Sequence, residues 1–287
     1  MFSNHRILFP VDFSEHLFNV PQAVGKLLDR PDVEVILLHV IDGAAPSASK
    51  MACGLETLDL LARRHFNRFT VRRRLDHGQP AERILDYIRD NEIEMVVIPA
   101  RETSSFGKGS FGHVANQIVA EADCPVWLEW PAASQKKAVS PAGLRICCAI
   151  EGSRHDETLI RDSALIADGL HGDLTIISSI SPRPKDSDAL FRDTLTGGEE
   201  VLREMERIDK LRPRIASRAE VTVAAGWREA VIGRAVREQR SDLLITGNCR
   251  KTIQAAEGAC PVLRLGRHPG RAVGLFGDYR KPYRKVA

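Results

Sequence analysis

The sequence predicts an α/β fold made of two tandem domains, each a doubly wound parallel sheet. Three observations support this prediction. Short apolar runs, which suit strands buried on both faces, alternate with amphipathic stretches that suit helices. The pattern restarts after residue 143, because residues 144–153 parallel 6–14 and residues 259–263 parallel 123–127. The length of 287 residues fits two domains at roughly 150 residues each.

The first domain is expected over residues 1–130, with strands marked by apolar runs and helices by an apolar residue at every third or fourth position. Strands are expected at residues 6–11, 33–40, 70–76, 95–98 and 126–130. Helices are expected at residues 16–29, 54–66 and 79–91, and from Gly112 or His113 onward. Leu55, Leu58 and Leu61 should face inward, as should Val114, Ile118 and Val119. Small, turn-forming residues at 42–49 predict a loop, and 70–76 should be an exposed strand.

The second domain is expected over residues 144–266. A stretch rich in Pro, Ala and Ser at 131–143 predicts the linker, and residues 267–287 form a basic tail.

The two copies differ after the fourth strand. With Gly247 matched to Ala100, Cys260 follows 13 positions later in the second copy, whereas Cys124 follows 24 positions later in the first. The second copy therefore lacks about eleven residues, which cover the loop and the first turns of the next helix. Glu151 also stands where the first copy has Asp12. We predict that the second domain is a structural partner without a ligand site.

The loop after residues 95–98 holds Gly107, Lys108 and Gly109 among hydroxyl residues and leads into a helix at Gly112. Where such a loop leads into a helix, the backbone N–H groups of the loop and of the helix N-terminus favour the binding of an anion. In parallel sheets ligands bind outside the carboxyl ends of the strands, where Pro10–Asp12, Val40 and this loop all lie. The sequence therefore predicts a ligand site in the first domain.

Composition argues against several other classes of function. The net charge of +3 is too small to indicate nucleic acid, and the arginines near residues 63–74 are better explained as solvated charge. The six cysteines show no C-x-x-C, and Cys124 and Cys260 lie in apolar surroundings, which favours buried thiols and a reducing compartment. No apolar run approaches the roughly 18 residues of a transmembrane helix. The arginines near residues 63–74 are Arg63, Arg64, Arg68, Arg72, Arg73 and Arg74.

Catalytic signatures are absent from the sequence. There is no H-E-x-x-H or G-x-S-x-G, and no motif ties Asp12 to a nucleophile or a second carboxylate. His39, at the end of a predicted strand, is best explained as a hydrogen-bonded structural histidine. We therefore do not expect an enzyme.

These residues resemble the universal stress protein family in its tandem two-domain form, over roughly 4–130 and 144–266. The resemblance lies in ILFPVDFSE, LLHV, GQPAERILDYI, HVANQIV and ADCPVWL, in this order. It implies an adenine nucleotide alpha-hydrolase-like fold with a five-stranded parallel sheet. Some members of the family bind ATP or AMP and others bind no nucleotide. They commonly dimerise, often through the last strand.

The family motif G-x2-G-x9-G-(S/T) falls on Ala100, Thr103, Gly112 and His113, with the spacing before Gly112 one residue short, so only Gly112 keeps the family residue. The acidic residue near the adenosine falls on Asp12, and the backbone that contacts adenine falls on Val40. Two interpretations remain open: a rearranged phosphate cradle, or a surface turn that has lost its ligand. The candidate site comprises Pro10, Val11, Asp12, Val40, Pro99, Ala100, Arg101, Gly109, Ser110, Gly112, His113 and Val114.

The resemblance thus predicts a cytoplasmic, non-catalytic stress-response regulator that binds ATP, ADP or AMP in its first domain, with Mg²⁺ accompanying ATP. The expected partners are a second copy in a homodimer, or the second domain in an intramolecular pseudo-dimer, and an unidentified protein. Membrane and nucleic acid are not expected. The alternatives are a nucleotide-free interaction scaffold of the same family and a slow nucleotide hydrolase.

Overall fold

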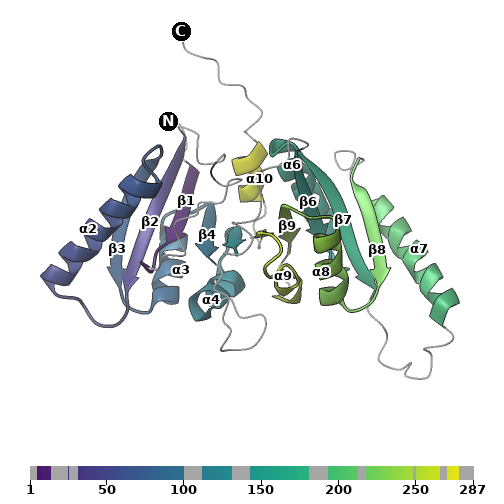
Figure 1. The fold of residues 1–287 in the computed structure, drawn as a ribbon, viewed down its shortest axis with the longest axis horizontal. Helices are drawn as coiled ribbons and strands as arrows, with labels where there is room; N and C mark the ends of the chain where they lie inside the picture. The colour runs from purple at the N-terminus through teal and green to yellow at the C-terminus, as the bar shows by residue number, and fades with distance from the viewer. Residues whose placement is uncertain are drawn as a thin grey trace, which may run out of the picture. The chain divides into compact units, whose positions relative to one another are not determined.

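The computed structural model describes residues 5–13, 25, 32–99, 112–130, 143–180, 193–212, 218–247, 250–265 and 270–277. The chain divides into two compact units, Met1–Lys136 with Leu265–Ala287 and Lys137–Arg264 (Figure 1). The helix expected at residues 16–29 lies outside the described residues, apart from Gly25, which is helical. The linker expected at 131–143 also lies outside them up to Gly143.

The first unit contains a sheet with the strand order β3-β2-β1-β4-β5, and each described strand pair within it is parallel. Ile7 and Leu8 of β1 have no exposed surface, as expected for a central strand covered on both faces. β3 forms the edge and is only partly buried, which agrees with its charged sequence. The strands are β1 His5–Pro10, β2 Val33–Ile41, β3 Thr70–His77, β4 Met95–Pro99 and β5 Val126–Glu129.

The described helices of this unit are α2 Ala48–His65, α3 Pro80–Asp90 and α4 His113–Glu121, with α10 Gly270–Gly277 from the end of the chain. α3 begins with Pro80, whose fixed φ suits the first helical turn, and it buries Ile84, Leu85 and Ile88. α10 was not expected within the basic tail, and its Leu275 and Phe276 are buried.

α2 begins six residues earlier than the sequence predicted. Ser47 caps it by accepting a hydrogen bond on Oγ from the Lys50 backbone N–H at 3.3 Å, so the predicted loop ends at residue 47. The buried stripe is Gly54, Leu58 and Ala62, whereas Leu55, predicted to face inward, is 45% exposed. A Cβ placed on Gly54 would lie 3.0 Å from Leu75 Cδ2, so this glycine lets the helix approach β3 closely.

The second unit repeats the same topology, with the order β10-β9-β6-β7-β8 and parallel pairs throughout its described strands. The predicted fold of tandem parallel α/β units is therefore confirmed (Figure 1). Its strands are β6 Leu144–Ala149, β7 Gly172–Ile180, β8 Glu220–Ala225, β9 Leu243–Thr246 and β10 Val262–Arg264. Its described helices are α6 Asp156–Gly169, α7 Asp193–Leu211, α8 Arg228–Glu238 and α9 Arg250–Ala255.

Strand register corrects the alignment of the two copies after the fourth strand. Leu8 of β1 pairs with Val96, whereas its counterpart Cys147 of β6 pairs with Leu244. Gly247 therefore corresponds to Pro99, and not to Ala100 as the sequence comparison assumed. Pro99 and Cys124 are 25 positions apart and Gly247 and Cys260 are 13 apart, so the second copy is shorter by twelve residues. α9 accordingly has six residues where α4 has nine.

The cysteines that the structure describes are free thiols, and four of them are buried. The predicted burial of Cys124 and Cys260 is confirmed, because 0% and 1% of their surfaces are exposed. Burial raises the pKa of Cys147 to about 11 and that of Cys148 to about 12. These two thiols therefore stay protonated and unreactive near neutral pH.

Replacing Gly54 by leucine should destabilise the protein, because the new side chain would push α2 away from Leu75 of β3. We expect a loss of about 1–3 kcal/mol in the free energy of unfolding measured by urea titration. Ala52→Leu, at an exposed position of the same helix, is the control and should change the stability by less than about 0.5 kcal/mol. Equal effects at the two positions would contradict the close approach.

Candidate functional site

A cavity of about 370 Å³ opens in the first unit at the carboxyl ends of β1, β2 and β4. The strand order changes direction between β1 and β4, so the cavity lies at the switch point where α/β sheets bind ligands. The residues that line it are Pro10, Val11, Asp12, Leu38, His39, Val40, Pro80, Ile84, Ile98, Pro99, Gly112, His113, Val114 and Ala115.

Eight of the twelve candidate residues line this cavity, although they come from three segments that lie far apart in the sequence: Pro10, Val11, Asp12, Val40, Pro99, Gly112, His113 and Val114. The other four, Ala100, Arg101, Gly109 and Ser110, lie outside the described residues. Sequence reasoning missed the contribution of α3, which supplies Pro80 and Ile84. The amphipathic pattern of residues 79–91 showed which face of α3 is buried, but not that its first turn reaches the site.

The segment after β1 is held to β2 by two hydrogen bonds. The Val11 N–H donates to the Leu38 carbonyl at 2.8 Å, and His39 Nδ1 lies 2.6 Å from the Val11 carbonyl oxygen. A carbonyl only accepts, so Nδ1 carries the proton in this contact. The prediction of a hydrogen-bonded structural histidine is confirmed. Burial of the ring lowers the pKa of His39, with a smaller effect from Lys50 in the same direction and an opposing one from the bond to Val11.

Gly112 is the N-cap of α4 and has a φ of 88°, in the left-handed region that favours glycine. Apart from its chain neighbours, no atom of the described residues lies within 4 Å of the place where a Cβ would stand, so the backbone conformation accounts for a glycine here. The first turn of α4 carries no acidic side chain, and its residues His113 to Ala115 line the cavity. The positive end of the helix dipole therefore favours an anion at this wall.

The cavity lining is mostly apolar, which suits a flat heterocycle, and Asp12 supplies a carboxylate at one end. None of the described lining residues is a serine, threonine, cysteine or lysine, so they do not provide a nucleophile with its base. The described residues also contain no cluster of three His, Cys, Asp or Glu side chains arranged for a metal ion. The described lining therefore fits the binding of a ligand with an apolar part.

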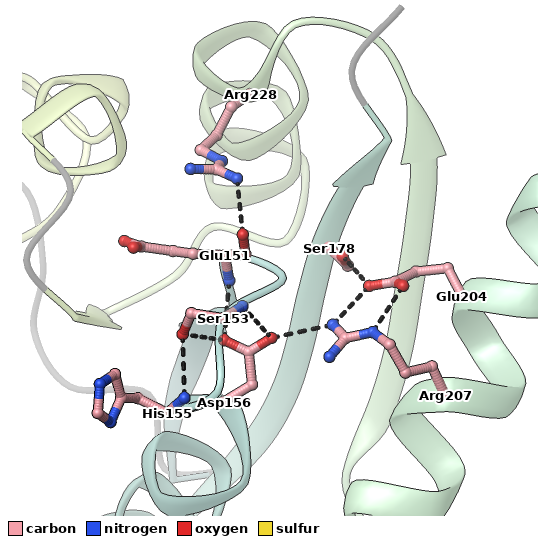
Figure 2. Close-up of polar contacts among 8 residues, drawn as sticks. All are labelled: Glu151, Ser153, His155, Asp156, Ser178, Glu204, Arg207 and Arg228. Atoms are coloured by element: carbon pink, nitrogen blue, oxygen red, sulfur yellow. Dashed lines mark hydrogen bonds and ion pairs between the residues drawn. The ribbon is translucent and has the colours of Figure 1, made fainter.

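The same edge of the second unit is occupied by its own side chains (Figure 2). Asp156, 1% exposed, accepts hydrogen bonds from the backbone N–H groups of Glu151 at 3.2 Å and Ser153 at 3.1 Å, and from Ser153 Oγ at 3.0 Å. Arg207 of α7 completes the set by donating to Asp156 Oδ2 at 2.9 Å. The loop after β6 is thereby fixed by a carboxylate and a guanidinium from its own unit.

Two positions show how the copies diverge. His39 and Ser178 correspond, because Pro10 pairs with Leu38 just as Ala149 pairs with Ile177. Ser178 Oγ donates to Glu204 at 2.7 Å, whereas His39 binds the segment after β1. The bond from Arg207 lowers the pKa of Glu204 more than any other contact.

The second divergent position lies at the start of the helix after the third strand. Arg228 follows Gly226 by two residues, as Pro80 follows Gly78. Arg228 donates to the Glu151 carbonyl at 3.0 Å, whereas Pro80 lines the cavity of the first unit (Figure 2). Where the first unit has a wall of its cavity, the second therefore has an arginine bonded to its own backbone.

Three of the six arginines in this cluster form ion pairs with carboxylates: Arg63, Arg72 and Arg73. Arg72 donates to Glu34 at 2.8 Å, and both Arg63 and Arg73 pair with Asp59. These pairs favour the interpretation of solvated surface charge. Separately, none of the helices that the structure describes combines the length and apolar character needed to cross a membrane.

Comparison with known proteins supports the resemblance. Residues 3–128 match the model of the universal stress protein family. A universal stress protein structure from Archaeoglobus fulgidus is similar, with a TM-score of 0.64 and 17% sequence identity over 93% of this chain and 97% of that one. A functionally unknown protein from Pseudomonas aeruginosa has a TM-score of 0.59 and 13% identity over 96% of both chains. No curated protein sequence matches significantly. At these identities the structures show a shared fold.

Removing the carboxylate of Asp156 should destabilise the second unit, because two backbone N–H groups would lose their acceptor and Arg207 would lose one of its two carboxylate partners. We expect Asp156→Ala to cost about 3 kcal/mol in urea unfolding, near the lower end for buried ion pairs, because the Arg207 side chain is 33% exposed. Glu199→Ala removes an exposed ion pair with Arg203 from the same helix and should cost less than about 1 kcal/mol. Similar losses in both variants would contradict a structural role for the Asp156 network.

Acidification should destabilise the protein through His39. Because the folded-state pKa is lowered, the unfolded chain takes up the proton first, so stability is retained above the ordinary pKa of 6.5 and declines as the pH falls towards the folded-state pKa. Urea unfolding between about pH 7.5 and 5 should show a larger loss in the wild type than in His39→Asn. Parallel pH profiles for the two proteins would argue against this effect.

Proposed function

We propose that this chain, whose residues 3–128 match the universal stress protein family, is a non-catalytic stress-response regulator that binds one adenine nucleotide in its first domain. One observation carries the proposal: three segments far apart in the sequence meet around one largely apolar cavity at the switch point of the sheet. ATP, ADP and AMP are the candidate ligands, with Mg²⁺ accompanying ATP.

Each part of such a ligand has a chemically suitable partner. The apolar walls, among them Val11, Val40 and Ile84, offer a surface for the base. The Asp12 carboxylate can accept hydrogen bonds from ribose hydroxyls. The phosphates would lie towards the N-terminus of α4 at Gly112, because the N-terminal end of a helix favours anions. Arg101, Gly109 and Ser110, in the segment outside the described residues, are proposed to add to the phosphate contacts.

The second domain is proposed to be the structural partner, because its corresponding loop is bonded to its own Asp156 and Arg228. A homodimer or an intramolecular pseudo-dimer, read by an unidentified protein partner, is the proposed route from binding to response. The buried free thiols support a reducing compartment, and we propose the cytoplasm.

Titration of the purified protein with ATP, ADP and AMP by calorimetry tests the proposal. At least one nucleotide should bind with a stoichiometry of one per chain, and Asp12→Ala should weaken it about tenfold to a hundredfold by removing a charged hydrogen-bond acceptor. Gly112→Val should also weaken binding, because valine disfavours a φ of 88°. Glu151→Ala, the matched change in the second domain, should leave the affinity unchanged.

The same experiment distinguishes the alternatives. No binding of any adenine nucleotide would overturn the proposal and favour a nucleotide-free interaction scaffold. Two sites per chain would overturn the assignment of a single site to the first domain. Steady phosphate release from ATP that is lost in Gly112→Val would instead favour a slow nucleotide hydrolase.

A further inference from the structure

We infer that His39 is a positioning residue for the nucleotide site: its Nδ1–H holds the Val11 carbonyl and thereby sets the place of Asp12. This inference rests on the proposed function, since it concerns how the same site is kept ready for its ligand. His39 belongs to β2 and lines the cavity. It binds Val11, and Asp12 is the next residue in the chain.

The contact engages the second backbone polar group of Val11. The Val11 N–H is already bonded to Leu38, and the bond from His39 uses the carbonyl of the same residue. Both groups of Val11 are then attached to β2. Because the peptide is planar, fixing the Val11 carbonyl also fixes the N–H of Asp12 and limits where its carboxylate can stand.

The aromatic ring of Phe13 makes a second contact with the same histidine. Its centroid lies 3.9 Å from that of the His39 ring, with the two planes tilted by 32°. Phe13 has a φ of 60°, a conformation that bulky residues rarely adopt. Packing against His39 compensates for this backbone conformation, so the histidine contacts the chain on both sides of Asp12.

The second unit supplies an internal comparison. Its equivalent backbone bond, from the Ile150 N–H to the Ile177 carbonyl at 3.0 Å, is kept. Its counterpart of His39 is Ser178, which donates to Glu204 of α7. The unit that has the cavity therefore also has a side-chain bond to the carbonyl after its first strand. In the second unit, which we propose binds no ligand, the equivalent side chain binds Glu204 instead.

A matched pair of substitutions isolates the hydrogen bond. Asparagine carries its amide nitrogen on Cγ, as histidine carries Nδ1, so His39→Asn can still donate to Val11. Glutamine carries the same group one carbon further out, so His39→Gln misplaces it. We expect nucleotide affinity to stay within about threefold of the wild type in His39→Asn and to fall about tenfold in His39→Gln. Ser178→Ala, at the equivalent position of the second unit, should leave affinity unchanged.

A double-mutant cycle shows whether His39 acts through Asp12. If it does, His39→Gln should weaken ATP binding in the wild-type background but have little further effect when Asp12 is already alanine. Thermal melting of each variant separates this coupling from a general loss of folding. If His39→Gln does not fold, the cycle is measured with His39→Asn and Phe13→Leu instead. Each is compared with the wild type, alone and combined with Asp12→Ala.

The outcomes separate this inference from the proposed function. If the wild type binds no adenine nucleotide, the proposed function fails and the positioning role fails with it. If the wild type binds but His39→Gln binds equally well, or its effect adds in full to that of Asp12→Ala, only the positioning role is overturned. Equal weakening in His39→Asn and His39→Gln would also overturn the role of Nδ1.

Discussion

Parallel pairing of β1 with both β2 and β4 is the constraint on which the rest of the first unit depends. Because the strands run in the same direction, their carboxyl ends must meet at one edge, and the segments that follow them are brought together there. In the sheet, β2 lies on one side of β1 and β4 on the other. The cavity lies where the connections to these two strands diverge, so its position follows from the strand order alone.

The two units share this constraint but differ in the side chains at the edge that it creates. Their strand orders and registers agree, yet one edge is open and the other is bonded to its own side chains. In the first unit this edge is lined mostly by apolar residues, whereas in the second unit Asp156, Arg207 and Arg228 form hydrogen bonds there. A twelve-residue shorter connection after β9 accompanies this difference.

Much of the fold could be predicted because it depends on local pattern. Sequence patterns placed the strands of the first unit to within one residue, and the repeat identified the two units. Errors arose where two local signals competed. Small residues before α2 favoured a loop, although Ser47 is an effective cap, and Leu55 fitted a helical stripe that Gly54 in fact occupies. The bonds of His39 to Val11 and of Ser178 to Glu204 join residues 26 or 28 positions apart, so no local pattern could have shown them.

The contrast between His39 and Ser178 also explains why a single substitution cannot turn one unit into the other. Serine cannot reach the carbonyl that histidine binds from the same strand position, and it is already committed to Glu204. Glu204 in turn shares Arg207 with Asp156, which holds the loop carrying Glu151. Separating Asp156 from Arg207 would leave a buried carboxylate without its charged partner, which destabilises the fold. The network and the shorter connection after β9 therefore both stabilise the present arrangement of the second unit. The chain is therefore asymmetric, with a cavity at this edge of the first unit and a hydrogen-bonded network at the same edge of the second.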